Sequence, residues 1–180
     1  MEKKVLSHDP NLCTGCMYCM IACSTSKEGS TSLSKARLQI IRHEGHALTK
    51  ITEEDELVFT FTGCQHCEDA ICALVCPTGA LKRDVETGAM MHLQEKCMGC
   101  RMCLTYCPFG GISFNQKKRQ VFKCDLCQGD PVCVKFCPVE ALTFVPAQEV
   151  PIAKRAVTAK KILDGIIEKG KAASGQGGTR

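Results

Sequence analysis

Apolar side chains fall in short runs along this chain, and the runs alternate with turn residues and cysteine-rich loops. Runs of this length that contain β-branched and aromatic residues predict β-strands. The runs are 37–41, 57–61, 80–83, 90–92, 111–114, 120–122 and 141–145. Glu86-Thr87-Gly88 separates the third run from the fourth, and a charged segment, 115–119, separates the fifth from the sixth. Both of these pairs therefore predict β-hairpins.

The spacing of apolar residues changes after Pro146. Apolar residues there recur every three or four positions, and Pro151 suits the first turn of a helix. The residues are Ile152, Ala156, Ala159, Leu163, Ile166 and Ile167. We therefore expect an amphipathic helix over 151–169, followed by a mobile tail rich in glycine and serine. This helix either packs on its own module or docks on a partner subunit.

Sixteen cysteines form four groups of four, and none is left over. Groups one and three have the spacing C-x2-C-x2-C-x3-C, which holds 4Fe–4S clusters in bacterial ferredoxins. Groups two and four keep the first and last gaps but have four and five residues in the middle gap. The groups are Cys13, Cys16, Cys19 and Cys23; Cys64, Cys67, Cys72 and Cys76; Cys97, Cys100, Cys103 and Cys107; and Cys124, Cys127, Cys133 and Cys137. This pattern predicts a protein that holds clusters and moves electrons.

The last cysteine of each group connects the groups in pairs. In two-cluster ferredoxins this cysteine binds the other cluster, and the proline after it sets the direction of the backbone. The prolines are Pro77, Pro108 and Pro138. Group one is the exception, since Ser24 follows Cys23. A unit of cysteine loop, short helix and short strand thus recurs, so we expect two ferredoxin-like modules related by pseudo-twofold symmetry.

Two other uses of cysteine fit less well. Structural zinc favours two C-x2-C pairs a dozen or more residues apart, and a third thiolate at x2 spacing has no place in such a site. Disulfides need an oxidising compartment. The segment before Cys13 has neither the apolar core of a secretory signal nor a twin-arginine pair. We therefore expect iron–sulfur clusters in a reducing, cytoplasmic setting.

Composition favours a core that is partly inorganic. The chain of 180 residues has no Trp, two Tyr and seven Phe, while cysteine makes up about 9% of it. At that level metals or crosslinks replace part of the hydrophobic core. No run approaches 18 apolar residues, so no direct membrane span is expected.

Charge is unevenly distributed. Residues 151–180 carry seven basic and two acidic side chains, whereas the rest of the chain carries 16 basic and 17 acidic ones. The basic end either contacts an acidic partner, offsets the charge of anionic clusters, or forms a solvated helix face. Nucleic-acid binding is not expected, because no aromatic residues are interleaved with the basic ones and the cysteines lack C2H2 spacing.

Longer signatures surround the cysteines. They are Cys64-Gln65-His66-Cys67, the stretch from Cys72 to Ala80, the stretch from Lys96 to Cys103, and Lys123-Cys124-Asp125-Leu126-Cys127 followed by Pro131 and Cys133. Through these signatures residues 1 to about 146 resemble the four-cluster electron-transfer subunits of molybdenum and tungsten oxidoreductases. That family includes the small subunits of tungsten aldehyde oxidoreductases, class II benzoyl-CoA reductases and formate dehydrogenase–hydrogenase complexes. One departure is Ala70, where such subunits commonly have proline.

The resemblance implies an α+β fold. It would consist of two pseudo-symmetric bacterial dicluster ferredoxin-like modules, with short strands and helices around the clusters, and a C-terminal helix. Residues 1–35 and 108–146 would form one module, which holds the clusters of groups one and four. Residues 36–107 would form the other, with inserted strands, and 147–180 would form the basic C-terminal helix and tail.

The resemblance also implies how the cysteines are shared among four 4Fe–4S clusters. The first cluster would be bound by Cys13, Cys16, Cys19 and Cys137, and its neighbour by Cys124, Cys127, Cys133 and Cys23. The third would be bound by Cys64, Cys67, Cys72 and Cys107, and the fourth by Cys97, Cys100, Cys103 and Cys76. Spacing alone predicts such sharing but does not choose these sets.

From the same resemblance we expect a non-catalytic subunit. It would relay electrons between a large catalytic subunit, a tungsten or molybdenum enzyme that contains a pterin, and a further redox protein. The alternatives are an electron-transfer subunit of a formate dehydrogenase–hydrogenase complex, a free-standing polyferredoxin and a zinc-stabilised interaction module.

Few residues other than cysteine point to chemistry. His66, inside the C-x2-C of group two, either donates to a cluster sulfur or contacts backbone or water. The other histidines, which lack ligand spacing, are His8, His43, His46 and His92. No Ser/His/Asp set, phosphate-binding glycine loop or carboxylate pair stands out in the sequence, so we expect bond-breaking chemistry on another chain.

Overall fold

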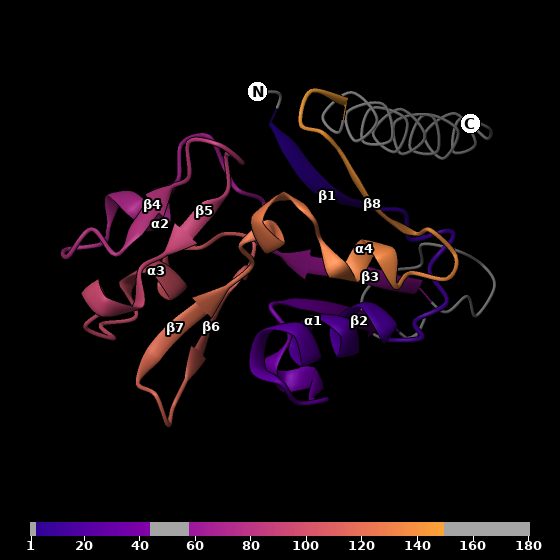
Figure 1. Ribbon diagram of the computed structural model, residues 1–180, viewed down its shortest axis with the longest axis horizontal. Helices are drawn as coiled ribbons and strands as arrows, with labels where there is room; N and C mark the ends of the chain where they lie inside the picture. Colours follow the sequence, from indigo (N-terminus) through magenta and orange to yellow (C-terminus); the bar gives the residue numbers. More distant parts are fainter. Residues whose placement is uncertain (1–2, 44–57, 150–180) are drawn as a thin grey trace, which may run out of the picture.

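The computed structural model describes residues 3–43 and 58–149 (Figure 1). The helix expected at 151–169 and the tail after it lie outside the described residues. The helices are α1 (Tyr18–Glu28), α2 (Ile71–Leu74), α3 (Met102–Thr105) and α4 (Val132–Lys135). The strands are β1 (Lys4–His8), β2 (Leu38–His43), β3 (Val58–Gly63), β4 (Leu81–Arg83), β5 (Met90–His92), β6 (Ile112–Asn115), β7 (Gln120–Lys123) and β8 (Leu142–Pro146). Short 3-10 turns lie at Leu33–Lys35, Gln94–Lys96 and Leu126–Gly129.

The strands pair two by two in antiparallel sheets, as β1–β8, β2–β3, β4–β5 and β6–β7. The pairs β4–β5 and β6–β7 confirm the two hairpins predicted from their turns. β1 was not predicted. It pairs with β8 from Lys4 opposite Pro146 to His8 opposite Leu142, and a partner so far along the chain leaves no turn signal between the strands.

The molecule has two halves, which Figure 1 shows next to each other. The first half contains β1, β8, α1, α4 and the β2–β3 pair, and the second contains α2, α3, β4–β5 and β6–β7. Helix α1 packs on α4 in the first half, as α2 packs on α3 in the second. The fold expected from the sequence, a mixed helix-and-strand structure with two ferredoxin-like units, is confirmed.

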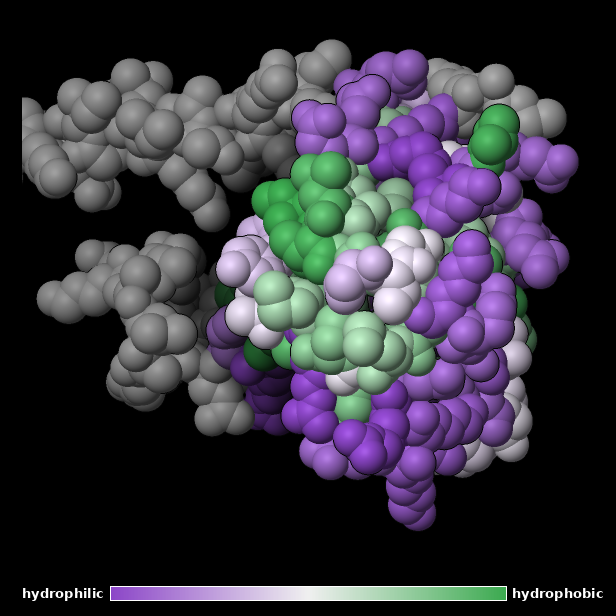
Figure 2. All heavy atoms as spheres, turned by 90° about the vertical axis from the view of Figure 1, so that its left-hand side faces the viewer, coloured by the Kyte–Doolittle hydropathy of each residue, from purple (hydrophilic) through white to green (hydrophobic). Residues whose placement is uncertain are grey.

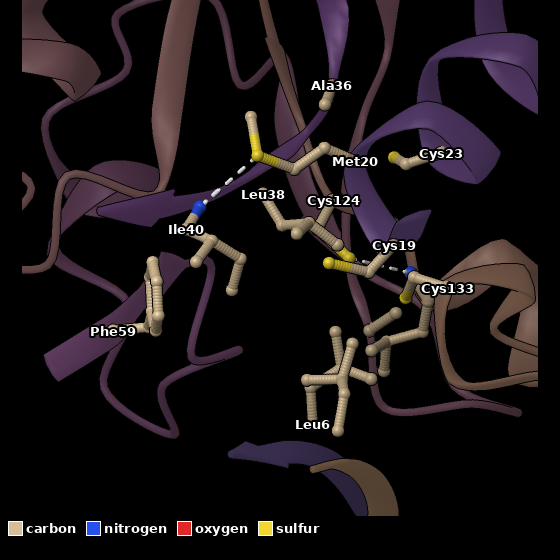
Figure 3. Close-up of a cluster of buried hydrophobic side chains, with 13 residues drawn as sticks. Leu6, Cys19, Met20, Cys23, Ala36, Leu38, Ile40, Phe59, Cys124 and Cys133 are labelled. Carbon is tan, nitrogen blue, oxygen red and sulfur yellow. Dashed lines mark hydrogen bonds between the residues drawn. The ribbon is translucent and has the colours of Figure 1, made fainter. Parts of the chain in front are cut away.

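The first half is built around a hydrophobic core that contains thiols (Figure 3). Met20 of α1 lies against Leu38 and Ile40 of β2, and its Sδ accepts a hydrogen bond from the Ile40 N–H at 3.4 Å. Phe59 of β3 and Leu6 of β1 close the core from other sides. The buried cysteines of this core are Cys19, Cys23, Cys124 and Cys133. Any object held by these thiols therefore lies inside the core.

The second half has a smaller core. It consists of Ala70, Leu81, Met90, Cys103, Ile112 and Val121. Two of these side chains come from β6 and β7, which were expected in the module of residues 1–35 and 108–146. Conversely, β2 and β3, expected in the module of residues 36–107, pack in the first core. The residue ranges of the two modules remain a proposal. The packing favours placing β2 and β3 in the first module and β6 and β7 in the second.

Apolar side chains remain exposed on the helices of both halves. Figure 2 shows apolar side chains gathered on the face that carries α2 and α3. Ile71 and Leu74 of α2 are exposed. In the first half, Tyr18, Ile21 and Phe136 line an open groove between α1 and α4. Across residues 3–43 and 58–149, no helix combines the length and apolar character that crossing a membrane requires.

Candidate metal centres

All sixteen cysteines are free thiols, and they line four cavities that we call A to D. Cavity A is lined by Cys13, Cys16, Cys19 and Cys137, and cavity B by Cys23, Cys124, Cys127 and Cys133. Cavity C is lined by Cys64, Cys67, Cys72 and Cys107, and cavity D by Cys76, Cys97, Cys100 and Cys103. Each cavity takes three cysteines from one group and the last cysteine of another. The resemblance implies the same four sets, and their role as cluster ligands stays a prediction.

The four cavities differ in size. The space free of protein atoms, part of it open to solvent, is about 340 Å³ in A, 290 Å³ in B and 280 Å³ in D, whereas C is wider at about 560 Å³. Among the described residues, no three His, Cys, Asp or Glu side chains stand close enough to hold a single metal ion. Four thiols around one cavity match the donor set of a 4Fe–4S cluster. The residues present therefore fit that group.

Left-handed backbone shapes the loops around the cavities. In the first C-x2-C segment of each group, the second residue between the cysteines has a positive φ; these residues are Gly15, His66, Gly99 and Leu126. In groups one, three and four the residue after that segment is also left-handed, at Met17, Arg101 and Gln128. Turns of this kind bring backbone N–H groups together into anion-binding hollows. A Cβ at Gly99 would lie 2.3 Å from the carbonyl oxygen of Arg119, so only glycine fits there.

Backbone N–H groups also donate directly to thiols. The donors and their acceptors are His66 to Cys64 (3.4 Å), Leu126 to Cys124 (3.4 Å), Ala80 to Cys76 (3.3 Å) and Arg37 to Cys23 (3.3 Å). Such bonds stabilise a thiolate and help to set the reduction potential of a cluster. The same fold that gathers the cysteines thus also supplies their donors.

Burial by itself opposes ionisation of these thiols. It raises the pKa of Cys19 and Cys103 to about 11 and that of Cys124 to about 12. Cys76 is an exception, because hydrogen bonds from the Thr78 hydroxyl and from backbone N–H groups outweigh its slight burial and lower its pKa. A bound metal supplies the positive charge that a buried thiolate needs, so cluster binding and loss of the thiol protons are coupled.

Thiols of different cavities lie within electrostatic reach of one another. The pKa of Cys133, in cavity B, is raised by burial, by the other thiols of that cavity and by Cys19 of cavity A. The pKa of Cys124, also in B, is raised by burial and by Cys64 of cavity C. Cavity B therefore neighbours both A and C.

Thiols of cavities C and D also lie within electrostatic reach of each other. The pKa of Cys103, in cavity D, is raised by burial, by Cys76 and Cys100 of D and by Cys72 of cavity C. The four cavities thus follow one another in the order A, B, C, D. The junction of the two halves falls between B and C.

Charged side chains surround cavity B. Lys27 of α1 pairs with Asp125 at 2.8 Å, and Arg37 pairs with Asp125 at 3.6 Å and with Glu28 at 3.9 Å. Burial would raise the pKa of Asp125, but the hydrogen bond from Lys27 and the nearby Arg37 charge lower it, so the carboxylate is the stable form. This network ties the helix of group one to the loop of group four and keeps Cys23 at cavity B.

A second set of polar contacts lies where the halves meet. Lys123 Nζ donates to the carbonyl oxygens of Met90 and Cys124, the latter at 2.7 Å, and Met90 N–H donates to His66 Nδ1 at 2.9 Å. Burial and nearby cations lower the pKa of His66 to about 3, so the ring is neutral and its proton resides on Nε2. That nitrogen is buried and has no hydrogen-bond partner among the described residues. The structure thus shows a backbone contact for His66, and donation to a cluster sulfur stays a prediction.

Sequence reasoning missed Arg83 and the role of Lys123. The Arg83 guanidinium donates to the carbonyl oxygens of Cys67, Glu68 (3.0 Å) and Gly88 (2.6 Å), and so holds the group-two loop that lacks a proline at Ala70. No spacing rule marks an arginine 16 residues after the cysteine whose carbonyl it binds. Lys123 stands directly before a cysteine, but its burial becomes visible only in three dimensions.

Known families and relatives match much of this chain. A family described as "4Fe-4S dicluster domain" matches residues 56–147, and a second with the same description matches residues 12–80. The thiosulfate reductase electron transfer subunit PhsB of Salmonella typhi is 36% identical over 125 residues, which are 68% of this chain and 62% of PhsB. The electron transport protein HydN of Escherichia coli K12 is 31% identical over 134 residues, which are 66% of this chain and 73% of HydN.

Other relatives are longer or more distant. The beta subunit of NADH-dependent phenylglyoxylate dehydrogenase from Aromatoleum evansii is 34% identical over 122 residues, and the match spans 68% of this chain but 26% of that subunit. A chain of the solved active site complex BamBC of benzoyl coenzyme A reductase with benzoyl-CoA is 19% identical, covers 93% of this chain and 98% of that chain, and has a TM-score of 0.44. We draw nothing from so distant a structural likeness. A family model covers more than half of the chain and sixteen cysteines match two domains of two clusters each, so this protein belongs to the 4Fe-4S dicluster domain family and holds four 4Fe–4S clusters.

Proposed function

We propose that this protein relays electrons in the cytoplasm between a large catalytic subunit and a further redox protein. The catalytic subunit would be a tungsten or molybdenum enzyme that contains a pterin, and bonds would be broken there rather than on this chain. The order of the four cavities carries the proposal. A series of centres connects two distant sites, whereas a diffusing shuttle needs only one or two.

The proposed ligands of the four clusters are the four cysteine sets that line cavities A to D. Two observations support this assignment. Each cavity gathers four thiols, and the last cysteine of every group crosses to a neighbouring cavity, as in two-cluster ferredoxins. When bound, the clusters accept and release single electrons. The chain itself contributes the thiolates, the N–H groups aimed at them, and a core that keeps water away from Cys124 and Cys133.

Two observations support a partner subunit. PhsB is named as the electron transfer subunit of thiosulfate reductase, so that relative works within a larger enzyme. In addition, both halves expose apolar side chains on the helices next to the cavities, among them Tyr18, Phe136 and Leu74. Exposed apolar surface of this kind is typical of faces that another protein covers.

Purification from native cells under mild, oxygen-free conditions tests the proposal. We expect about sixteen irons and sixteen sulfides per chain, and co-elution with a large subunit that contains a pterin. Zinc in place of iron would refute the cluster content. A monomer that carries all its clusters and donates electrons to several unrelated enzymes would refute the relay in favour of a free-standing polyferredoxin.

A further inference from the structure

Lys123 is the largest fully buried side chain of the described residues, with 2% of its surface exposed. It ends β7 and stands directly before Cys124 of cavity B, yet its side chain lines cavity C. Long cationic side chains are almost never fully buried unless they are paired. The burial of Lys123 therefore indicates a functional role for this side chain.

The contacts of Lys123 place its ammonium at the junction of the two halves. Nζ donates to the carbonyl oxygen of Cys124, next to cavity B, and to that of Met90 in β5 of the second half. An ammonium has three N–H groups, so these two acceptors leave one available on the side of cavity C. No carboxylate of the described residues forms an ion pair with Lys123: Asp125 pairs with Lys27 and Arg37, and Asp69, which also lines cavity C, forms no ion pair with it.

We propose that the Lys123 ammonium raises the reduction potential of the cluster held in cavity C, and so sets the energy of electron transfer between the two halves. This inference rests on the proposed assignment of the cysteine ligands. On reduction the cluster in cavity C gains one electron and the neighbouring cluster loses one, and no bond or proton changes. The cluster in C becomes more negative by one charge, which an unpaired buried cation beside it stabilises more strongly than water-exposed charge does.

Electrostatics of the thiols supports this placement. Lys123 acts to lower the pKa of Cys72 in cavity C and that of Cys124 in cavity B, although burial dominates and raises both. The same positive charge thus favours the anionic form on both sides of the junction. Because the side chain lines C and not B, we expect the larger effect in C.

The test replaces the charge but keeps the hydrogen bonds. Lys123→Gln retains an amide NH2 that reaches toward the two carbonyl oxygens, and Lys123→Arg retains the charge. Lys96→Gln is the matched control, because Lys96 also stands directly before a cluster cysteine but is exposed. The readouts on the purified protein with its clusters are iron content and the midpoint potentials of the individual clusters, followed by EPR during an anaerobic redox titration.

We expect Lys123→Gln to keep about sixteen irons and to lower one midpoint potential by about 59 mV, a tenfold change in the one-electron reduction equilibrium. Lys123→Arg should restore the wild-type potential, and Lys96→Gln should change all potentials much less. Loss of iron from one cluster in Lys123→Gln, with full iron in Lys123→Arg, would also support a charge requirement.

Three results would overturn the inference. They are unchanged potentials in a fully loaded Lys123→Gln protein, an equal shift in Lys96→Gln, or loss of all iron in both Lys123 variants, which would make the lysine purely structural. Failure of the relay itself would be seen separately, in the wild-type protein. It would show as the absence of a large partner subunit while the potentials of the four clusters remain measurable.

Discussion

Cavities B and C each hold four thiols, but in different surroundings. Three thiols of B are buried in the first core, and a carboxylate, Asp125, balances the cations beside it. The thiols of C are all half-buried, its space is nearly twice as large, and the cation that lines it, Lys123, has no carboxylate partner among the described residues. Two cavities with equal numbers of thiols can therefore differ in burial and charge balance, which influence how tightly a cluster is held and how readily it is reduced.

The largest contrast is expected from removing the third cysteine of each set. Cys133→Ala deletes a thiol from the centre of the first core, where cavities A and B adjoin, so we expect loss of both clusters and about eight irons. Cys72→Ala deletes a half-buried thiol, so we expect loss of one cluster and about four irons. Anaerobic iron and sulfide analysis measures both. Equal losses would show that burial does not distinguish the two halves.

The next contrast tests whether the last cysteine of each group binds the cluster in the neighbouring cavity. Cys23→Ala should remove the cluster of cavity B, although the other thiols there lie more than 100 residues along the chain, and should leave cavity A occupied. Cys76→Ala should likewise remove the cluster of D and spare C. EPR spectra of the reduced variants show which signals disappear. Loss of the cluster of A in Cys23→Ala, with B retained, would reverse the assignment.

A smaller effect is expected from the apolar side chains. Leu38→Ala opens space in the large core of the first half and should cost about 3–4 kcal/mol. Leu81→Ala, the matched leucine of the smaller core, should cost about 2–3 kcal/mol because fewer neighbours surround it. The midpoint of anaerobic unfolding in guanidinium, followed through cluster absorbance, measures the difference. A larger loss for Leu81→Ala would contradict the ranking of the two cores.

The smallest contrast concerns ion pairs. Asp125→Asn removes the acceptor of both Lys27 and Arg37 beside cavity B, and should cost about 2 kcal/mol of stability because these cations stay half-buried. Asp130→Asn breaks the exposed pair with Lys135 and should cost less than about 0.5 kcal/mol. The same unfolding measurement applies. An effect of Asp130→Asn as large as that of Asp125→Asn would show that burial adds nothing to these pairs.

Sequence alone predicted the features that depend on neighbours along the chain. The cysteine spacing and the β4–β5 and β6–β7 hairpins follow from local geometry. The pairing of β1 with β8 was missed, because its register depends on packing between segments more than 130 residues apart. Arg83 and Lys123 were missed for a related reason. Their partners are backbone carbonyl oxygens, which every residue has and which leave no mark in a sequence.

The pairing of β1 with β8 also bears on how the protein is made. A ribosome releases the first cysteine group early, but the strand that pairs with β1 and the cysteines that complete cavities A and B emerge only near residue 146. The residues that line C and D end at Lys123 and are complete before that. Domains generally form as units during synthesis. We therefore expect the middle of the chain to close first and the first-made thiols to be enclosed last.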